Sequence, residues 1–499
     1  MKESRRDFLK KSGCALGMTT LATQMEHFGA ISALAQRSVK TRFAAEAADY
    51  KALVLVFWQG GNDGNNTIIP NHSDASVSNY SAYSAARNLQ GLAIAQNQLL
   101  PVSVPRVNNL TYGLHPSFGP VAGGLNNGIH ELWAQQRLAA VTNCGTLVRP
   151  LTKTTYQNGT VQKPYQLFSH SDQVAQYQTS ISTTQAFTGW GGRIADKLTA
   201  SQNPGGLVPM ITSISGAQLF TAGQQTLPMA IASANNTGTP NLANVLNPVG
   251  FNATTASQAR LSAFNQLRSV DLDSNFVKEA SHVTDLAMSA NAALQTSQEV
   301  TVSFPNTSLG LQLKQVARLI KKRTDLNVGR QIFYCQLGSF DTHNNQVATQ
   351  GNLVSQFSQA ARSFYDEMVV QGIDQGVTLF SLSDFGRTFN PAGSGGTVGS
   401  DHAWGNHMFI LGGSVIGGDF YGVNTTNGTP YPTLTIGAAG PDDTDSNTGS
   451  RGRWIPSTSV DQYANTLARW FGLPQDAPTL ESVFPNLDNF STNNLGFLP

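Results

Sequence analysis

Carboxylate and imidazole side chains stand next to several apolar runs of this sequence, where strands would end or begin. They are Asp63, Asp341, His343, Asp384 and His402. Carboxylate oxygens and imidazole nitrogens are donors that Zn²⁺, Mn²⁺ and Mg²⁺ take in proteins. Two such ions can hold a transferring phosphoryl or sulfuryl group and activate an attacking oxygen. A single Asp after a strand more often caps a helix or forms a turn. The repeated placement therefore carries the hypothesis of a divalent-metal site.

The apolar runs beside these residues have the length of strands and are continuous rather than alternating. They cover 52–58, 138–143, 331–337, 377–382 and 408–411. Continuous apolarity is typical of strands buried on both faces of a parallel sheet. Apolar residues at helical spacing lie between the runs, over 309–320 and 353–368. This alternation predicts an α/β fold, a three-layer sandwich with a mostly parallel central sheet. Ligands of such folds bind outside the carboxyl ends of the strands, where the candidate metal ligands are expected.

A second candidate site is the run Ser169-His170-Ser171-Asp172, which precedes a predicted helix over 173–179. A serine at a helix N-terminus would face the anionic part of a ligand, so Ser169 and His170 are candidate catalytic residues. The alternative is that a hydroxyl or the carboxylate of this run only caps the helix. The choice of nucleophile stays open between Ser169, Ser171 and Thr67.

The rest of the chain indicates one domain over 51–499. Residues 200–260 are rich in Asn, Gly, Thr and Pro, and with the helical patterns that follow they predict an irregular and helical insertion at about 200–323. A Gly- and Asp-rich loop is expected over 430–453. An amphipathic helix is expected over 460–472, with Tyr463, Leu467 and Trp470 roughly on one face.

The N-terminus has the parts of a twin-arginine secretory signal. Arg5 and Arg6 precede Phe-Leu-Lys, a short apolar run follows, and Ala33-Leu34-Ala35 offers a small-residue cleavage site. The alternative is a basic amphipathic first helix. We expect a signal peptide over 1–35, a tether over 36–50, the twin-arginine translocase as export partner, and a periplasmic or secreted product.

Composition and motifs exclude several other functions. The leader carries five of the 31 basic and three of the 30 acidic residues, so the remainder is near neutral and has no charge footprint for nucleic acid. No later segment approaches eighteen uninterrupted apolar residues, so no membrane span is expected. The glycines over 60–64 lack dinucleotide spacing and no phosphate-binding P-loop occurs, so no nucleotide cofactor is expected. Cys144 and Cys335 are predicted to be buried thiols rather than a disulfide.

The chain resembles the bacterial domain-of-unknown-function family 1501, twin-arginine-exported proteins of the alkaline phosphatase and sulfatase superfamily. The matching stretches include LVLVFWQGGNDGNNTIIP, LFSHSDQ, TGWGGR, LGSFDTH, LSDFGRT and SDHAWGNHMFILGG. The resemblance implies an alkaline-phosphatase-like fold. It also implies that Asp63 matches the first-strand metal Asp, Asp341 and His343 the middle pair, Asp384 the late Asp, and His402 the final His.

The sequence departs from the superfamily at Phe385, where a second imidazole would follow Asp384. Two function hypotheses follow. The first is a metal-dependent hydrolase of phosphate or sulfate esters, acting on a small-molecule ester with a divalent Zn, Mn or Mg ion. The second is a non-catalytic exported binding protein on the same fold, which Phe385 and the unassigned nucleophile favour.

Overall fold

The computed structural model describes residues 49–234, 254–268 and 299–499 apart from position 448, with isolated residues between 270 and 294. The predicted signal peptide over 1–35 and the predicted tether, except for residues 49 and 50, lie outside the described residues. Among the helices that are described, none combines the length and hydrophobicity of a membrane span.

The main sheet of the described chain has nine strands in the order β11-β5-β10-β9-β1-β8-β6-β7, with β12 paired to β5. Every pair in it is parallel except those of β10, which is antiparallel to both β5 and β9. The predicted mostly parallel sheet is therefore confirmed. The strands are β1 (Lys51–Trp58), β5 (Leu138–Gly145), β6 (Ile211–Ser213), β7 (Met229–Ala230), β8 (Arg330–Leu337), β9 (Val377–Ser383), β10 (Asn406–Gly412), β11 (Phe420–Tyr421) and β12 (Thr458–Ser459).

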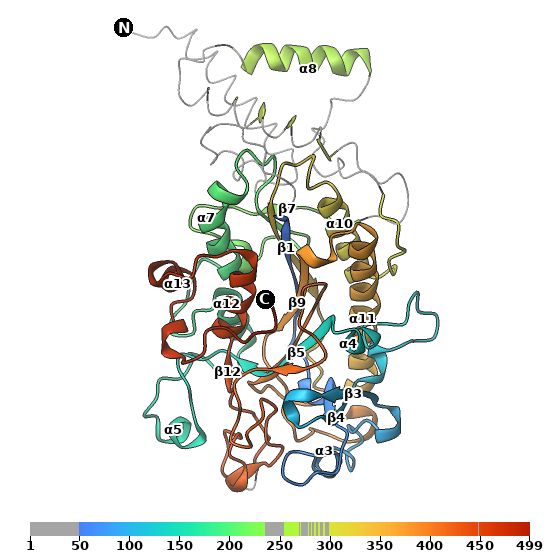
Figure 1. Cartoon of the computed structure of the whole chain (residues 1–499), viewed down its shortest axis with the longest axis vertical. Coiled ribbons are helices and arrows are strands. Elements are labelled where there is room, and N and C mark those ends of the chain that lie inside the picture. Colours follow the sequence, from blue (N-terminus) through green and yellow to red (C-terminus); the bar gives the residue numbers. More distant parts are fainter. Residues whose placement is uncertain are drawn as a thin grey trace.

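Helices cover both faces of this sheet, which explains why its central strands are apolar throughout (Figure 1). Val54 and Val56 of β1 belong to the core with α10 (Ser308–Lys321) and α11 (Gln346–Val370). Leu53 and Leu55 point the other way, into the core with the helices of the opposite face. Those helices are α6 (His170–Thr179), α7 (Trp190–Gln202), α12 (Val460–Phe471) and α13 (Ala477–Val483). The three-layer α/β fold is thus confirmed.

α11 begins at Gln346 and α6 at His170, before the residues 353 and 173 where the sequence patterns start. Other helix ends lie where the sequence signals them. Thr307 accepts a hydrogen bond from the Gly310 backbone at the start of α10. After α11 the chain turns at Gly372, whose φ is +64°, and α12 ends at Gly472, whose φ is +110°. These left-handed positions suit glycine because it has no Cβ.

A smaller antiparallel sheet lies beside the main one, in the order β2-β4-β3. The sequence did not indicate it, because its strands are short and mixed in polarity. Its strands are β2 (Ile68–Pro70), β3 (Leu100–Val104) and β4 (Leu110–Leu114), and the further α-helices are α3 (Tyr80–Arg87), α4 (Glu131–Ala134), α5 (Lys153–Asn158) and α8 (Thr255–Arg268). Short 3₁₀ helices cover Gly64–Asn66, Gln96–Gln98, Pro105–Val107, Pro116–Phe118, Leu219–Thr221, Asp374–Gly376, Gly395–Thr397, Gly437–Ala439 and Leu487–Asn489.

The segment predicted as an insertion over about 200–323 is more integrated than its composition indicated. Its first part supplies β6 and β7 at one edge of the main sheet, and its last part supplies α10, which packs in the core. α8 lies beyond one end of the sheet (Figure 1). Residues 235–253 lie outside the described chain.

Cys144 and Cys335 are buried free thiols, as predicted. Each lies inside a strand of the main sheet, and burial raises the pKa of both thiols well above the usual value. A thiol held in its neutral form in an apolar core packs as a small hydrophobe and is unreactive.

Candidate metal centre

The strand directions bring the predicted metal ligands to one edge of the main sheet. β1, β8 and β9 run parallel and end at Trp58, Leu337 and Ser383. β10 runs the opposite way and begins at Asn406, so the segment 384–405 leaves and returns at the same edge. His402 therefore stands beside the residues that follow β8 and β9, although it precedes its own strand.

Three imidazoles and one carboxylate converge at this edge. The Nε2 atom of His402 lies 3.1 Å from Nε2 of His170 and 3.0 Å from Nε2 of His343. Asp341 Oδ1 lies 3.4 Å, 3.1 Å and 3.5 Å from the Nε2 atoms of His170, His343 and His402. We call these four residues the imidazole cluster. One ligand atom each from His170, Asp341 and His402 lies within 4.8 Å of the others, and His343 joins them through His402 and Asp341.

The other ring nitrogen of each histidine faces a hydrogen-bond acceptor. Nδ1 of His170 lies 2.7 Å from Asp384 Oδ2, and Nδ1 of His402 lies 2.8 Å from the Phe168 carbonyl oxygen. Nδ1 of His343 lies 3.2 Å from Asp401 Oδ1. Carbonyl and ionised carboxylate oxygens only accept, so this network assigns the proton of each neutral ring to Nδ1. The Nε2 lone pairs then face one another.

Facing lone pairs repel unless a cation or a further proton lies between them. The donor set fits a cation: imidazole nitrogens with one carboxylate are typical zinc ligands, each held through its second nitrogen by a carboxylate or carbonyl. A tetrahedral zinc site with bonds of about 2.0–2.1 Å has ligand atoms about 3.3 Å apart. The five separations of 3.0–3.5 Å among these atoms are close to that value.

Electrostatics favours the metal-binding forms of Asp341, His343 and His402. Partial burial raises the pKa of Asp341, but the hydrogen bond and charge of Arg387 outweigh burial and hold that pKa below its usual value. Burial is the main cause that lowers the pKa of His343 and of His402, and nearby Arg387 adds to it. The hydrogen bond to Asp384 raises the pKa of His170. At neutral pH, Asp341 is therefore an anion while His343 and His402 are neutral.

Arg387 fixes Asp341 at the cluster. Its fully buried guanidinium donates Nε to the Gly61 carbonyl at 2.8 Å and Nη1 to the Ser400 carbonyl at 2.9 Å. Nη2 donates to the Gly60 carbonyl and to Asp341 Oδ1. One side chain thus ties the loop after β1, the loop after β8 and the approach to β10 together.

Phe385 packs against the imidazoles where the resemblance would place another ligand. Its ring centroid lies 4.7 Å from that of His170 and 4.8 Å from that of His402, and the side chain is fully buried. Gly61, with φ of +77°, leaves room for this ring, because a Cβ there would lie 2.5 Å from Phe385 Cε2. The position supplies packing and no donor atom.

Asp63 and Asp384, both predicted as metal ligands, lie outside the imidazole cluster. Asp63 is buried and pairs with Arg87, whose Nη1 lies 2.6 Å from Oδ2. Its oxygens also accept from Gln346 Nε2 at 2.5 Å and from the Asn65 backbone at 3.1 Å. Asp384 accepts from the Gly60 backbone at 3.0 Å and reaches the cluster only through His170. Both carboxylates are occupied by protein donors.

Ser169 occupies the N-cap position of α6, but its side chain makes no capping hydrogen bond. Its hydroxyl donates to Asp172 Oδ2 at 2.6 Å. The next residue is His170, so Ser169 lies next to the cluster. Thr67 is buried and donates to the Gly64 carbonyl at 3.0 Å, while Ser171 is exposed. Ser169 and Ser171 both flank the cluster histidine His170, and Ser169 is the less exposed of the two.

Sequence reasoning missed Arg387, Asp401 and the role of the Phe168 carbonyl. Asp401 directly precedes His402, and its Asp-His spacing was a usable signal. Arg387 lies three residues after Asp384, in a stretch already noted for its resemblance. The hydrogen bond of the Phe168 carbonyl could not be predicted from the sequence, because Phe168 has a left-handed backbone with φ of +70°.

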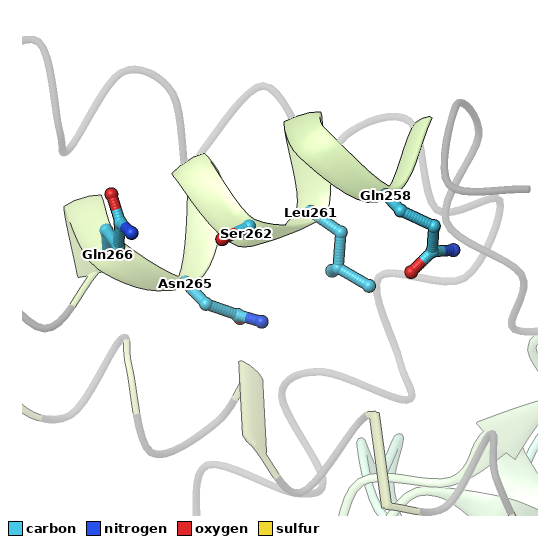
Figure 2. A pocket seen from close by; sticks show the side chains of 5 residues that line it. All are labelled: Gln258, Leu261, Ser262, Asn265 and Gln266. Atoms are coloured by element: carbon cyan, nitrogen blue, oxygen red, sulfur yellow. The ribbon is translucent and has the colours of Figure 1, made fainter. Parts of the chain in front are cut away.

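A pocket on α8 is separate from this sheet edge. Figure 2 shows its side chains along that helix: Gln258, Leu261, Ser262, Asn265 and Gln266. It contains no titratable group and no metal donor other than amide and hydroxyl oxygens. The imidazole cluster is therefore a better candidate than this pocket for a catalytic or metal site.

The family model described as "Protein of unknown function (DUF1501)" matches residues 50–432. None of the curated proteins is a significant match to the sequence. Among solved structures, the chain is similar to Ps i-CgsB in complex with k-i-k-neocarrahexaose, at 8% identity and a TM-score of 0.32, over 89% of this chain and 75% of that one.

Two further solved structures show a likeness of the same kind. The PsFucS1 sulfatase from Pseudoalteromonas sp. has 9% identity and a TM-score of 0.28, over 82% of this chain and 68% of that one. The lipoteichoic acid synthase LtaP from Listeria monocytogenes has 9% identity and a TM-score of 0.24, over 85% and 79%. At these identities and TM-scores the likenesses say nothing of this chain's reaction.

Proposed function

This chain belongs to the DUF1501 family of proteins of unknown function, and we propose that it is an exported metal-dependent hydrolase of phosphate or sulfate esters. One observation carries the proposal. Three histidines, each held through Nδ1 by an acceptor, turn their Nε2 atoms toward one another and toward Asp341 Oδ1. Without a cation this arrangement sets lone pair against lone pair.

His170, His402 and Asp341 would hold the ion, with His343 as a further donor. Imidazole-rich sets suit Zn²⁺ and tolerate Mn²⁺, whereas Mg²⁺ prefers oxygen ligands. A bound ion of this kind supplies Lewis-acid polarisation of an ester oxygen. Because Asp63 is paired with Arg87 and Phe385 offers no donor, the chain's own ligands suffice for one ion rather than two.

The charges around the cluster favour an anionic substrate. The carboxylates of Asp341, Asp384 and Asp401 stand in contact with the cluster, and Arg387 and Arg451 pair with two of them. With the histidines neutral, these groups sum to one negative charge, and a divalent ion would reverse that sum to one positive charge. A phosphate or sulfate ester would complement this charge.

Ser169 is the proposed nucleophile. It lies at the start of α6, where the backbone N–H groups and helix dipole favour an anionic group. Its hydroxyl already donates to the Asp172 carboxylate, which orients the oxygen for attack. The adjacent His170 would be one of the residues that hold the ion.

A second candidate function is a metal-binding protein without hydrolytic activity. Phe385 favours it, because its buried ring fills space beside His170 and His402 that another ligand or a substrate oxygen would occupy.

Metal content and ester hydrolysis of the purified mature protein test both candidates. Wild-type protein loaded with Zn²⁺ or Mn²⁺ is expected to retain about one ion per chain after dialysis and to hydrolyse phosphate or sulfate monoesters. His402→Ala should lose the ion and the activity. His130→Ala, at a half-buried ring that contacts the Pro101 carbonyl outside the cluster, is the matched control and should keep both. Retained metal with no hydrolysis selects the second candidate, and no metal in the wild type contradicts both.

A further inference from the structure

A cationic and aromatic surface adjoins the imidazole cluster on the side of α5. We propose that this surface, built around Lys163 and Arg453, binds a second anionic group on the organic part of the ester. The proposal rests on the proposed function, since it deepens the substrate class of the same site. The substrate would then be an ester, such as a multiply substituted sugar, that bears at least two anionic groups.

Arg453 lies directly beside the cluster. Its Nε donates to the carbonyl of His402 at 3.1 Å. Its guanidinium carbon lies 4.8 Å from the centroid of Phe168, the residue whose carbonyl accepts from His402 Nδ1. The side chain is 28% exposed. Solvent and ligands can therefore reach the Arg453 guanidinium, which is hydrogen-bonded to the backbone of the proposed metal ligand His402.

Lys163 extends this positive surface away from the cluster. Its ammonium lies 4.0 Å from the ring centroid of Tyr156. Burial and the charge of Asp445 raise the pKa of the Tyr156 hydroxyl, and the charge of Arg453 opposes them. Tyr156 in turn packs on Trp404, two residues after His402, at 5.9 Å between ring centroids. Contacts thus join Lys163 through Tyr156 to Trp404, which lies close to His402 in the chain.

The nearby carboxylates leave these two cations under-compensated. The closest carboxylate to Arg453 is that of Asp445, at 3.8 Å, which is a weak contact. In the described chain Lys163 has a ring contact but no ion pair. Asp443 is buried and accepts from the backbones of Gly437, Asp445 and Arg453. Asp442 accepts from the Thr433 backbone.

The other cations of this surface already have protein partners. Arg451 pairs with Asp401. Lys153 donates to the carbonyls of Gly437 and Gly440. The contrast singles out Lys163, which has no ion pair among the described residues, and Arg453, whose carboxylate contact is the one to Asp445 at 3.8 Å.

The aromatic backing strengthens these cations. Tyr156 and Phe168 are partly buried against a small apolar core of Leu147, Trp404, Ile455 and Phe490. A cation on an aromatic face, shielded from water on that side, attracts an anion more strongly than a fully hydrated lysine does. The mature chain as a whole is near neutral, so this attraction is local and does not indicate a nucleic-acid surface.

The test compares esters that differ only in their number of anionic groups. Zn²⁺-loaded protein is titrated by calorimetry with glucose 6-phosphate and glucose 1,6-bisphosphate, and separately with a glucose monosulfate and disulfate. One well-placed ion pair at a half-exposed site gives about fivefold in affinity. We expect the wild type to prefer the doubly charged ester of at least one series by about that factor, and the preference to fall as salt is raised.

Lys163→Met should reduce this preference to near one, with an unchanged metal content. Lys197→Met, at an exposed lysine of α7, is the matched control and should keep the wild-type preference. Equal binding of both esters by the wild type, or an undiminished preference in Lys163→Met, overturns the subsite while the proposed function stands. Failure of the wild type to bind any of the esters overturns the proposed function and the subsite together.

Discussion

The acceptor on Nδ1 decides what each histidine of the cluster can do through Nε2. Three chemically different acceptors serve this purpose: a buried carboxylate, a backbone carbonyl and a half-exposed carboxylate paired with Arg451. Of these, Asp384 makes the shortest contact, at 2.7 Å, and is almost fully buried. It would act on a bound metal ion through His170 rather than as a ligand, which is how outer carboxylates tune metal sites.

Asp384→Asn should weaken Zn²⁺ binding by about 10- to 100-fold, as loss of an outer-sphere partner usually does. The amide oxygen of the variant would still accept from the Gly60 backbone, so its NH₂ group would face His170. A donor there favours the tautomer with its proton on Nε2, which cannot bind a metal. Competition with a chelator measures the affinity, and far-UV circular dichroism checks the fold.

Asp366→Asn is the matched control for this change. Asp366 lies on α11 and pairs with Arg362 at 2.9 Å, and no contact joins it to the cluster. Its substitution should leave the Zn²⁺ affinity unchanged. Equal affinity of Asp384→Asn and wild type would show that the His170 tautomer does not depend on Asp384.

At the scale of elements, the direction of β10 is what completes the cluster. The sequence predicted His402 beside the other ligands, although a histidine just before a parallel strand would lie at that strand's amino end, away from them. Because β10 is antiparallel to β9, the start of β10 lies at the carboxyl end of β9, and His402 lies there with the other ligands. The apolar run over 408–411 predicted the strand, but short apolar runs carry no information on direction.

The start of α12 holds a buried carboxylate whose protonation should control stability. Burial raises the pKa of Asp461 from 3.8 to about 6, against hydrogen bonds that favour the anion, such as that from Ser459. A raised pKa means that the folded state binds the proton more tightly than the unfolded chain. This residue's contribution to the free energy of unfolding therefore rises as the pH falls from above 6 to about 4.

Asp461→Asn should remove this dependence. Relative to the variant, the wild type should gain up to roughly 3 kcal/mol in free energy of unfolding between pH 7 and pH 4. Urea unfolding of both proteins at several pH values measures the difference. Asp476→Asn, at an exposed helix cap of α13, controls for a general change in net charge. Parallel pH profiles of wild type and Asp461→Asn would contradict the assignment.

For the whole molecule, the layers could be predicted from the sequence. Which carboxylates face the imidazoles and which pair with arginine could not. Continuous apolar runs such as 52–58 and helical spacing such as 309–320 report burial directly, and burial determines the layers. Asp63 and Asp341 look alike in sequence, since each follows a buried strand. Only the fold shows that Asp63 pairs with Arg87. Asp341 pairs with Arg387 and still contacts three imidazoles. The sequence predicted a catalytic role for His170, whereas its place among the imidazoles depends on long-range packing.

The proposed export concerns the whole chain and is tested apart from its chemistry. Replacing Arg5 and Arg6 by Lys should stop delivery to the periplasm, because the consecutive arginines select the twin-arginine route. Cell fractionation with an antibody to the mature protein measures delivery, and N-terminal sequencing should find cleavage after Ala35. Lys10→Arg changes a basic residue outside the Arg5-Arg6 pair without changing its charge, so this control should be exported normally. Unchanged delivery of the double Lys variant would rule out this route.

A bound ion should stabilise the folded chain, because its ligands come from three distant segments. His170 begins α6, Asp341 and His343 follow β8, and His402 precedes β10. The unfolded chain does not hold these donors together, so the ion binds mainly the folded state. At a free ion concentration 100 times Kd, this linkage contributes about 2.7 kcal/mol. Added Zn²⁺ should therefore raise the Tm of metal-free wild type, and a chelator should reverse the change.

The His402→Ala variant separates this linkage from non-specific effects of the metal. Its metal-free Tm can differ from that of the wild type, so the informative quantity is the response of each protein to Zn²⁺. We expect little response in His402→Ala and a full response in His130→Ala, whose substituted ring lies outside the cluster. An equal rise in Tm for wild type and His402→Ala would place the bound zinc elsewhere on the chain. The facing Nε2 atoms would then have to share protons, with at least one imidazole charged at neutral pH.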